Sequence, residues 1–305
     1  MIARNIITML IIYLLLQLTF IDTTPRVMVD ESWYANTAWN FSIDNGFNNS
    51  VPGHGGGELF FLYTFSLGIA FKLFGTSLFI AKMVSIIGGL IGLIGFINVL
   101  KVLQITNRFI VIVSGLIFIF SNVNYIVFRT VRPESLVVCF AIWAIFYLLK
   151  GNRSNHYNYY YSISGLLSGF SLLCHPHGAF FILIIGLLII YRSYENNNFR
   201  IIISFVTGCI IALLPLLYNI YFLRSENLFQ FIESLLGSSP SSVLEIKAYD
   251  IFFRFFEDYT LGIKRIYIFL IEIGVLVLGV FYYKKDKRIF IFSLMGLLFF
   301  FLFIL

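Results

Sequence analysis

The sequence contains few charged residues. Only 12% of its 305 residues are Asp, Glu, Lys or Arg, whereas 59% are hydrophobic and 19% are aromatic. Ordinary soluble domains carry about 25% charged residues. Half that share cannot cover the surface of a globular chain of this length in water. The composition therefore excludes a soluble enzyme and indicates that lipid is the solvent.

Cysteine and nucleotide-binding motifs are also scarce. Three cysteines, Cys139, Cys174 and Cys209, lie in or beside apolar runs without C-x-x-C spacing. They indicate neither a disulfide framework nor a cysteine-based zinc site. The chain has no G-x-G-x-x-G motif after a strand and no G-K-S/T motif. This excludes the common nucleotide-binding loops.

Long charge-free runs take up most of the chain. A helix that crosses about 30 Å of hydrocarbon needs roughly 17–25 apolar residues. The run between Arg153 and Arg192 contains His175-Pro176-His177-Gly178, which predicts two helices joined by a turn. The runs lie between Arg4 and Asp22, Lys82 and Lys101, Arg108 and Arg129, Glu134 and Lys150, Arg153 and Arg192, Arg200 and Arg224, Arg265 and Lys284, and from Arg288 to the end.

The short apolar run 59–71 determines the orientation of every later helix. Its 13 residues are few for a membrane span and typical of an interfacial helix. If it does not cross, the short Lys- and Arg-rich loops all lie inside, as such loops do, and the loops 22–82 and 224–265 lie outside. We therefore predict an all-α polytopic membrane protein with nine spans in a single domain, 1–305, without a soluble C-terminal domain.

The ends of the chain and its charge agree with this topology. The first run ends at Ile21-Asp22-Thr23-Thr24-Pro25 without an A-x-A-like cleavage site, which indicates an uncleaved helix with an inside N-terminus. The net charge of +6 is explained by basic inner loops that face anionic lipid, so no nucleic-acid partner is expected. The predicted location is the bacterial inner membrane, with the functional site facing outward.

The first external loop carries adjacent carboxylates, Asp30 and Glu31. The segment from Glu31 to about Ser42 is predicted to form a short helix with an aromatic face for the bilayer surface. One interpretation is structural, with Asp30 as the N-cap and Glu31 in the first turn. The other is catalytic, because a lipid-borne substrate needs a general base at the outer mouth of the bundle.

Two further external segments carry candidate binding residues. The segment 53–58 places His54 and Glu58 around glycines whose backbone can approach an anionic ligand closely, although a flexible turn explains it equally well. Arg132 and Glu134 flank Pro133, which is good local chemistry for a helix start. Arg132 is also a permanent cation suited to a lipid phosphate.

Three other positions complete the candidates. His175 and His177 flank a proline at an outer turn and can bind phosphate or metal, although this spacing alone is a weak metal signal. Arg224 begins the second external loop. Glu272 lies within an apolar run, where a carboxylate is costly and therefore a functional candidate without an assigned role.

In their order and spacing these segments resemble GT-C type glycosyltransferases that use polyprenyl- or dolichyl-phosphate sugars, in particular the protein mannosyltransferase and aminoarabinose-transferase-like families. The chain departs from these families at His54-Gly55-Gly56, where members often have His-Pro-Pro or Lys-Pro. It is also shorter than many members and is either a short member or an incomplete one. The resemblance covers residues 1–225 and rests on Asp30-Glu31-x-Trp33-Tyr34, His54 with the segment 58–63, Phe71-Lys-Leu-Phe-Gly75, the segment 125–134 and the segment 165–178.

The resemblance implies a GT-C bundle with two interfacial helices in the first external loop. It implies a hexosyl- or pentosyltransferase that moves a sugar from a polyprenyl phosphate to a protein, lipid or glycan hydroxyl. Asp30 corresponds to the motif carboxylate, with Glu31 beside it. We expect Asp30 to act as the general base and the configuration of the sugar to invert. A divalent cation, Mg²⁺ or Mn²⁺, stays open, with Asp30 and Glu134 able to recruit it. The expected substrate-binding residues are His54, Glu58, Arg132, Glu134, His175, His177 and Arg224.

Two other functions use the same scaffold. A transporter or lipid flippase predicts polar residues near the middle of several spans, whereas here they gather at the outer mouth, with Glu272 as the main exception. A non-catalytic partner subunit predicts the same bundle without transfer activity. Transfer from a polyprenyl-phosphate sugar separates these alternatives.

Overall fold

A computed structural model describes residues 2–23, 25, 27, 29–47, 49–50, 61–105, 107–218, 274 and 277. The chain divides into two compact units, Met1–Ser225 and Glu226–Leu305, and every helix named below belongs to the first. The described residues form ten helices and no strand, which confirms the all-α class. The single domain predicted over 1–305 stays a prediction, and the last two predicted spans lie outside the described residues.

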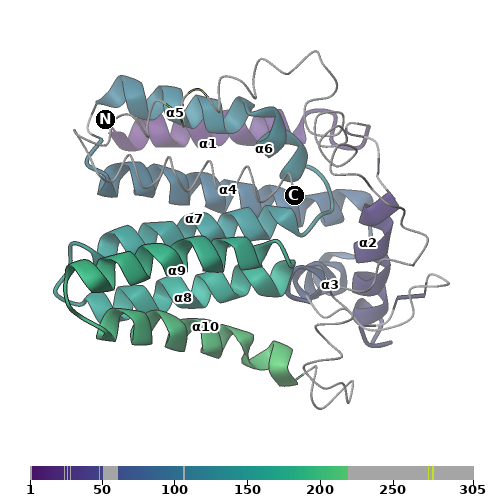
Figure 1. Cartoon of the computed structure of the whole chain (residues 1–305). Coiled ribbons are helices and arrows are strands. Elements are labelled where there is room, and N and C mark those ends of the chain that lie inside the picture. The colour runs from purple at the N-terminus through teal and green to yellow at the C-terminus, as the bar shows by residue number, and fades with distance from the viewer. Residues whose placement is uncertain are drawn as a thin grey trace. The chain divides into compact units, whose positions relative to one another are not determined.

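Most of the described helices lie side by side as a bundle (Figure 1). The helices α1, α4 and α5 pack together, α4 packs against α7, α7 against α8, and α8 against both α9 and α10. Four of them, α4, α7, α9 and α10, are long and apolar enough to cross a bilayer. The bundle comprises α1 (Ile2–Leu18), α4 (Leu78–Val102), α5 (Arg108–Phe120), α7 (Glu134–Gly151), α8 (Tyr157–Cys174), α9 (Gly178–Glu195) and α10 (Arg200–Tyr218).

The helix α8 lies between its neighbours and is held by small residues. Gly165 and Gly208 face each other's helices so closely that a Cβ at either would lie 2.0 Å from a backbone oxygen opposite. Ser164 Oγ donates to the Ala144 carbonyl at 2.8 Å, so a polar residue within the bundle has a partner. Small side chains allow this close approach of helices in lipid, where packing replaces the hydrophobic effect.

The third predicted span, 108–129, is interrupted in the structure. The helix α5 ends at Phe120, Ser121 has a non-helical ψ of 126°, and the short helix α6 (Asn122–Val127) follows. The Asn124 side-chain amide donates to the Phe118 carbonyl at 2.9 Å. It therefore satisfies one of the carbonyls that a helix end leaves without an intrahelical partner. The run of apolar residues did not reveal this break.

The helices α2 (Val29–Ser42) and α3 (Leu62–Phe74) pack against each other at one end of the bundle. In Figure 1 the bundle helices run across the view, whereas α2 lies crosswise to them and α3 is seen end-on. The helix predicted over 31–42 is thus present as α2, two residues longer at its start. The interfacial position of both helices stays a prediction.

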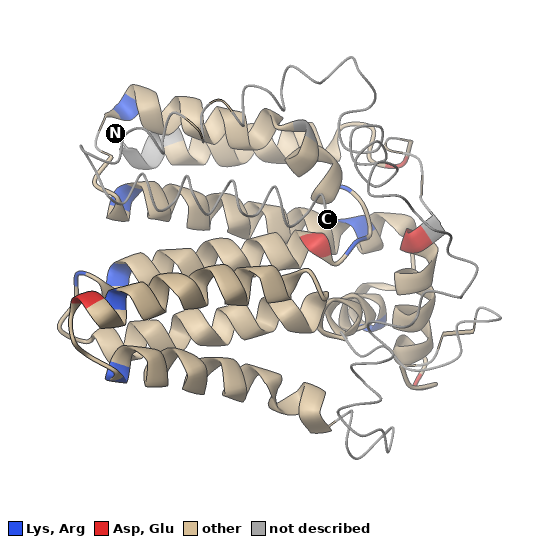
Figure 2. Ribbon diagram, in the orientation of Figure 1, with Lys and Arg blue, Asp and Glu red and all other residues tan. Residues whose placement is uncertain are grey.

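The two ends of the bundle differ in charge (Figure 2). We call the end that carries the loops 103–107, 152–156 and 196–199 the basic end, because Lys and Arg predominate there. We call the opposite end the polar end. It holds both signs of charge and comprises α2, α3, the loop 128–133 and the turn 175–177.

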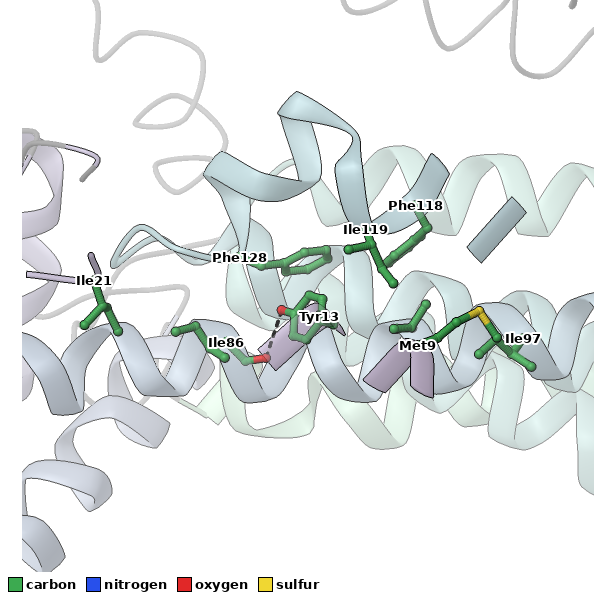
Figure 3. Close-up of a cluster of buried hydrophobic side chains, with 9 residues drawn as sticks. Met9, Tyr13, Ile21, Ile86, Ile97, Phe118, Ile119 and Phe128 are labelled. Carbon is green, nitrogen blue, oxygen red and sulfur yellow. Dashed lines mark hydrogen bonds between the residues drawn. The ribbon is translucent and has the colours of Figure 1, made fainter. Parts of the chain in front are cut away.

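A cluster of buried apolar side chains connects α1, α4, α5 and the chain after α6 (Figure 3). Within it, the Tyr13 hydroxyl donates to the Ile86 carbonyl at 3.0 Å, and its ring lies edge-on to Phe128 at 6.4 Å between centroids. Phe128 is fully buried. Because Phe128 precedes Arg129, this core holds the loop 128–133 at the polar end of the bundle.

Candidate functional site

Four segments of the polar end bring their charged and imidazole groups together. The first turn of α2 carries Asp30 and Glu31, and the loop 128–133 carries Arg132. Glu134 is the first residue of α7, next to Pro133 at its N-cap. Acidic side chains at both helix starts are favourable because the helix dipole is positive there. The turn between α8 and α9 contributes the two histidines.

Arg132 connects two carboxylates that are far apart in the sequence. Its Nη2 atom lies 2.7 Å from Glu134 Oε1 and 3.9 Å from Asp30 Oδ2. Burial alone would lower the pKa of the Arg132 guanidinium, but Glu134 and then Asp30 raise it above its usual value. Its Nε atom is buried and has no hydrogen-bond partner within the described residues. Arg132 is thus a permanent cation with one face turned to the carboxylates.

Asp30 and Glu31 lie in different environments although they are neighbours. The Asp30 side chain is 47% exposed. Glu31 is only 1% exposed, and its Oε2 accepts the backbone N–H of Val131 at 2.7 Å. Glu31 thereby connects α2 to the loop that carries Arg132. Of the two carboxylates that the sequence suggested as catalytic, Asp30 is the accessible one.

The turn after α8 holds His175 and His177 against each other. Their ring centroids are 4.3 Å apart, and the His177 backbone N–H donates to His175 Nδ1 at 3.3 Å. Gly178 allows this tight turn, since a Cβ there would lie 2.2 Å from the backbone of α8. Burial lowers the pKa of His175 to about 3, with smaller effects of His177 and Arg132, so this imidazole is neutral at neutral pH.

Glu134 lies beside both imidazoles. One potential ligand atom from each of Glu134, His175 and His177 lies within 4.8 Å of the other two. The pKa of His177 is also lowered, chiefly by burial, while Glu134 opposes this shift and Arg132 adds to it. Asp30 and Glu134, which the sequence suggested as joint metal-recruiting residues, both lie beside the Arg132 guanidinium.

A chain of hydroxyl groups on three helices contacts the loop 128–133. The Tyr63 hydroxyl lies 3.0 Å from Ser85 Oγ, which lies 3.2 Å from Ser135 Oγ. Ser135 Oγ donates to the Arg132 carbonyl at 2.9 Å. These contacts join α3, α4 and α7. Sequence reasoning missed all three residues because isolated Ser and Tyr in apolar helices carry no motif.

Two buried cations hold the chain around the end of α1. Arg129 donates through Nη1 to the Leu16 carbonyl at 2.9 Å and through Nη2 to the Thr19 carbonyl. Lys82 Nζ donates to the Ile21 carbonyl at 2.6 Å. The last carbonyls of a helix lack intrahelical partners and bear partial negative charge, so cations are favourable there. In the sequence, both residues mark only the limits of apolar runs.

Several predicted residues cannot be placed. His54, Glu58, Arg224 and Glu272 lie outside the described residues. The structure therefore brings together Asp30, Arg132, Glu134, His175 and His177, and turns Glu31 inward. This arrangement offers an accessible carboxylate beside a fixed guanidinium. The carboxylate can accept a proton, and the guanidinium can bind an anion next to it.

A comparison with protein families matches the part of the chain that carries most of these residues. The model of the dolichyl-phosphate-mannose-protein mannosyltransferase family matches residues 60–222, which is more than half of the chain. The match includes Arg132, Glu134 and both histidines, and begins after Asp30 and Glu31. No curated protein and no solved structure matches the chain.

Proposed function

Because the chain belongs to the dolichyl-phosphate-mannose-protein mannosyltransferase family, we propose that its polar end transfers a sugar from a polyprenyl phosphate to an acceptor hydroxyl. The chain is an integral membrane protein and a glycosyltransferase of the GT-C type that uses a polyprenyl-phosphate sugar donor. The observation that carries the finer proposal is the half-exposed Asp30 carboxylate beside Arg132, at 3.9 Å.

In the proposed reaction the acceptor oxygen attacks the anomeric carbon from the face opposite the phosphate. The new glycosidic bond forms as the bond between this carbon and the phosphate oxygen breaks, so the configuration inverts. The acceptor proton passes to the Asp30 carboxylate. Phosphate is already a good leaving group, so the remaining tasks are to position the reactants and to stabilise the departing charge.

Arg132 is proposed to bind the phosphate of the donor. Its Nη2 lies beside Asp30 and Glu134, while its buried Nε has no hydrogen-bond partner within the described residues. A guanidinium can donate from several of its nitrogens at once, which suits a phosphate held next to the general base. His54, Glu58 and Arg224 stay predicted contacts of the donor or the acceptor.

The polar end is proposed to face outward. Lys101 lies in the last turn of α4, Arg108 begins α5, and Lys150 and Arg153 lie at the end of α7 and just after it, all at the basic end. Figure 2 shows Lys and Arg gathered at this end. Lys and Arg concentrate in short cytoplasmic loops. In a bacterial inner membrane the transfer would therefore take place on the extracytoplasmic side, where the lipid-borne sugar and its acceptor would meet.

The replacement Asp30→Asn tests the proposed base. A general base contributes about 10²- to 10⁴-fold to a rate, so transfer by the purified variant is expected to fall by about that factor. The measurement is a mass-spectrometric transfer assay with a panel of polyprenyl-phosphate sugars.

Asp44→Asn is the matched control, because Asp44 is an exposed carboxylate just after the end of α2 that pairs with Lys72 near the end of α3. Transfer by this control should be unchanged. Full transfer by Asp30→Asn would refute the base. A wild-type protein inactive with every donor of the panel would favour a transporter or a non-catalytic subunit.

A further inference from the structure

We propose that Glu134, His175 and His177 bind one divalent transition-metal ion of the zinc class. The three side chains come from the start of α7 and from the turn between α8 and α9. Their potential ligand atoms lie within 4.8 Å of one another, and all three residues are partly buried. Two imidazoles and one carboxylate form a ligand set found in zinc sites with an open coordination position.

The Glu134 carboxylate has one oxygen left for a cation. Its Oε1 accepts from Arg132 Nη2 at 2.7 Å. Its Oε2 is buried and has no hydrogen-bond partner within the described residues. A buried acceptor without a partner is costly, and a bound ion can supply the missing partner. A phosphate at this position would instead bring a second negative charge against the carboxylate.

The ligand types favour zinc-like ions over Mg²⁺ and Mn²⁺. Imidazole nitrogen binds Zn, Cu, Fe and Ni well, whereas Mg²⁺ and Mn²⁺ prefer oxygen ligands. The proposed site has mixed nitrogen and oxygen ligands. It differs from the pair Asp30 and Glu134, which offers oxygen ligands only and suits Mg²⁺ or Mn²⁺.

Metal binding requires the ligand atoms to draw closer together. A tetrahedral ion at about 2.1 Å from each ligand holds the ligand atoms about 3.4 Å apart, whereas here they lie within 4.8 Å of one another. For His175, binding through Nδ1 replaces the long 3.3 Å contact with the His177 N–H, and binding through Nε2 uses the other tautomer and gives up that contact.

Three protein ligands leave a fourth position for a phosphate oxygen of the donor. Arg132 contacts Glu134 directly, so this position borders the proposed phosphate site. An ion held by the three residues would polarise a phosphate bound at this fourth position and stabilise the charge that develops on it. This role rests on the proposed function, whereas metal binding itself does not.

The test measures metal binding directly on the full chain in detergent. The wild type is stripped with a chelator and then titrated with Co²⁺ or Zn²⁺. Bound metal is counted by elemental mass spectrometry, and the Co²⁺ visible absorption reports the ligand geometry. We expect one ion per chain.

Three variants locate the site. His177→Ala and Glu134→Gln should weaken Co²⁺ binding by more than about 100-fold, since the loss of an outer-shell partner alone costs 10- to 100-fold. His156→Ala is the matched control, because this exposed histidine lies at the basic end and should leave binding unchanged. Thermal unfolding of each variant verifies that it folds, and Glu134→Gln preserves shape if His177→Ala does not fold.

The outcomes separate the site from its role. Absence of stoichiometric metal in the wild type, or variants that bind as tightly as His156→Ala, would overturn the site. One ion per chain in a protein that transfers no sugar from any donor would support the site and refute the proposed function. One ion per chain with transfer unchanged after chelation would leave the site standing and refute its role at the phosphate.

Discussion

The two ends of the bundle hold their charged side chains in different ways. At the basic end, Arg192 pairs with Glu195 three residues later on α9, and Lys101 contacts Asn98 on α4. At the polar end, Arg129 contacts the end of α1, 113 residues away, and Glu31 contacts Val131, 100 residues away. The Arg192 and Lys101 contacts thus stay within one helix, whereas the Arg129 and Glu31 contacts join segments that are far apart in the sequence.

Burial explains why this difference has energetic consequences. Arg129 and Glu31 are almost fully buried, and in low-dielectric surroundings a polar group that loses its partner costs its full desolvation energy. The Arg192 and Glu195 side chains are 32% and 46% exposed, so water replaces a lost partner there. Equivalent replacements at the two ends therefore test the comparison.

The largest effect is expected for Arg129→Ala. The change leaves the Leu16 and Thr19 carbonyls without this donor, and each unsatisfied buried acceptor costs about 1–3 kcal/mol. We expect the free energy of unfolding to fall by about 2–4 kcal/mol, measured by unfolding in detergent micelles. Arg153→Ala, an exposed arginine of the basic end, is the control and should stay within about 0.5 kcal/mol. Equal losses at both ends would contradict the comparison.

A smaller effect is expected for Glu31→Gln. A hydrogen bond to a charged group contributes about 1.5–3 kcal/mol, and the amide keeps the shape of Glu31 but removes the charge opposite the Val131 N–H. The unfolding free energy should fall by about 1–3 kcal/mol, measured in the same micelles.

The variant Asp30→Asn should change stability by less than about 0.5 kcal/mol, because Asp30 is half exposed. The two adjacent carboxylates would then have separate roles: replacing Glu31 lowers stability, whereas replacing Asp30 lowers transfer. If Asp30→Asn destabilised the protein as much as Glu31→Gln, the separation of their roles would fail.

The last prediction concerns sidedness and involves almost no change in stability. Thr76→Cys at the polar end should react with a membrane-impermeant thiol reagent on intact cells. Asn155→Cys at the basic end should react only after permeabilisation. Both positions are exposed, and the native cysteines Cys139, Cys174 and Cys209 are buried. Thr76 is preferable to Gly75, whose φ of 85° would strain a side chain. The reverse labelling pattern would invert the proposed orientation.

Much of the fold could be predicted from the apolar runs. Charge-free stretches correspond to α1, α4, α7 and α10, and the His175-Pro176 break separates α8 from α9. The interruption between α5 and α6 was missed, because it depends on one side-chain contact to a carbonyl. The start of α4 also differed: it begins at Leu78, so Lys82 lies inside the helix rather than before it.

The candidate site was predicted at the outer mouth of the bundle, but not the contacts within it. Asp30, Arg132, Glu134, His175 and His177 were each chosen for their chemistry, and the sequence contains no signal for which of them touch. Tyr63 and Ser85 escaped notice because their role comes from contacts with other helices. The only signal in the sequence is a polar side chain within an apolar run, and many membrane helices contain such residues.

The sequence by itself determined that this protein lies in lipid, where its helices run and which few polar residues are available for chemistry. It did so because the cost of charge in hydrocarbon is visible in composition and spacing. The tertiary structure alone decided which of the two adjacent carboxylates, Asp30 or Glu31, is exposed. Successive helical residues point about 100° apart, so the exposure of Asp30 and the burial of Glu31 depend on how α2 docks against the loop 128–133.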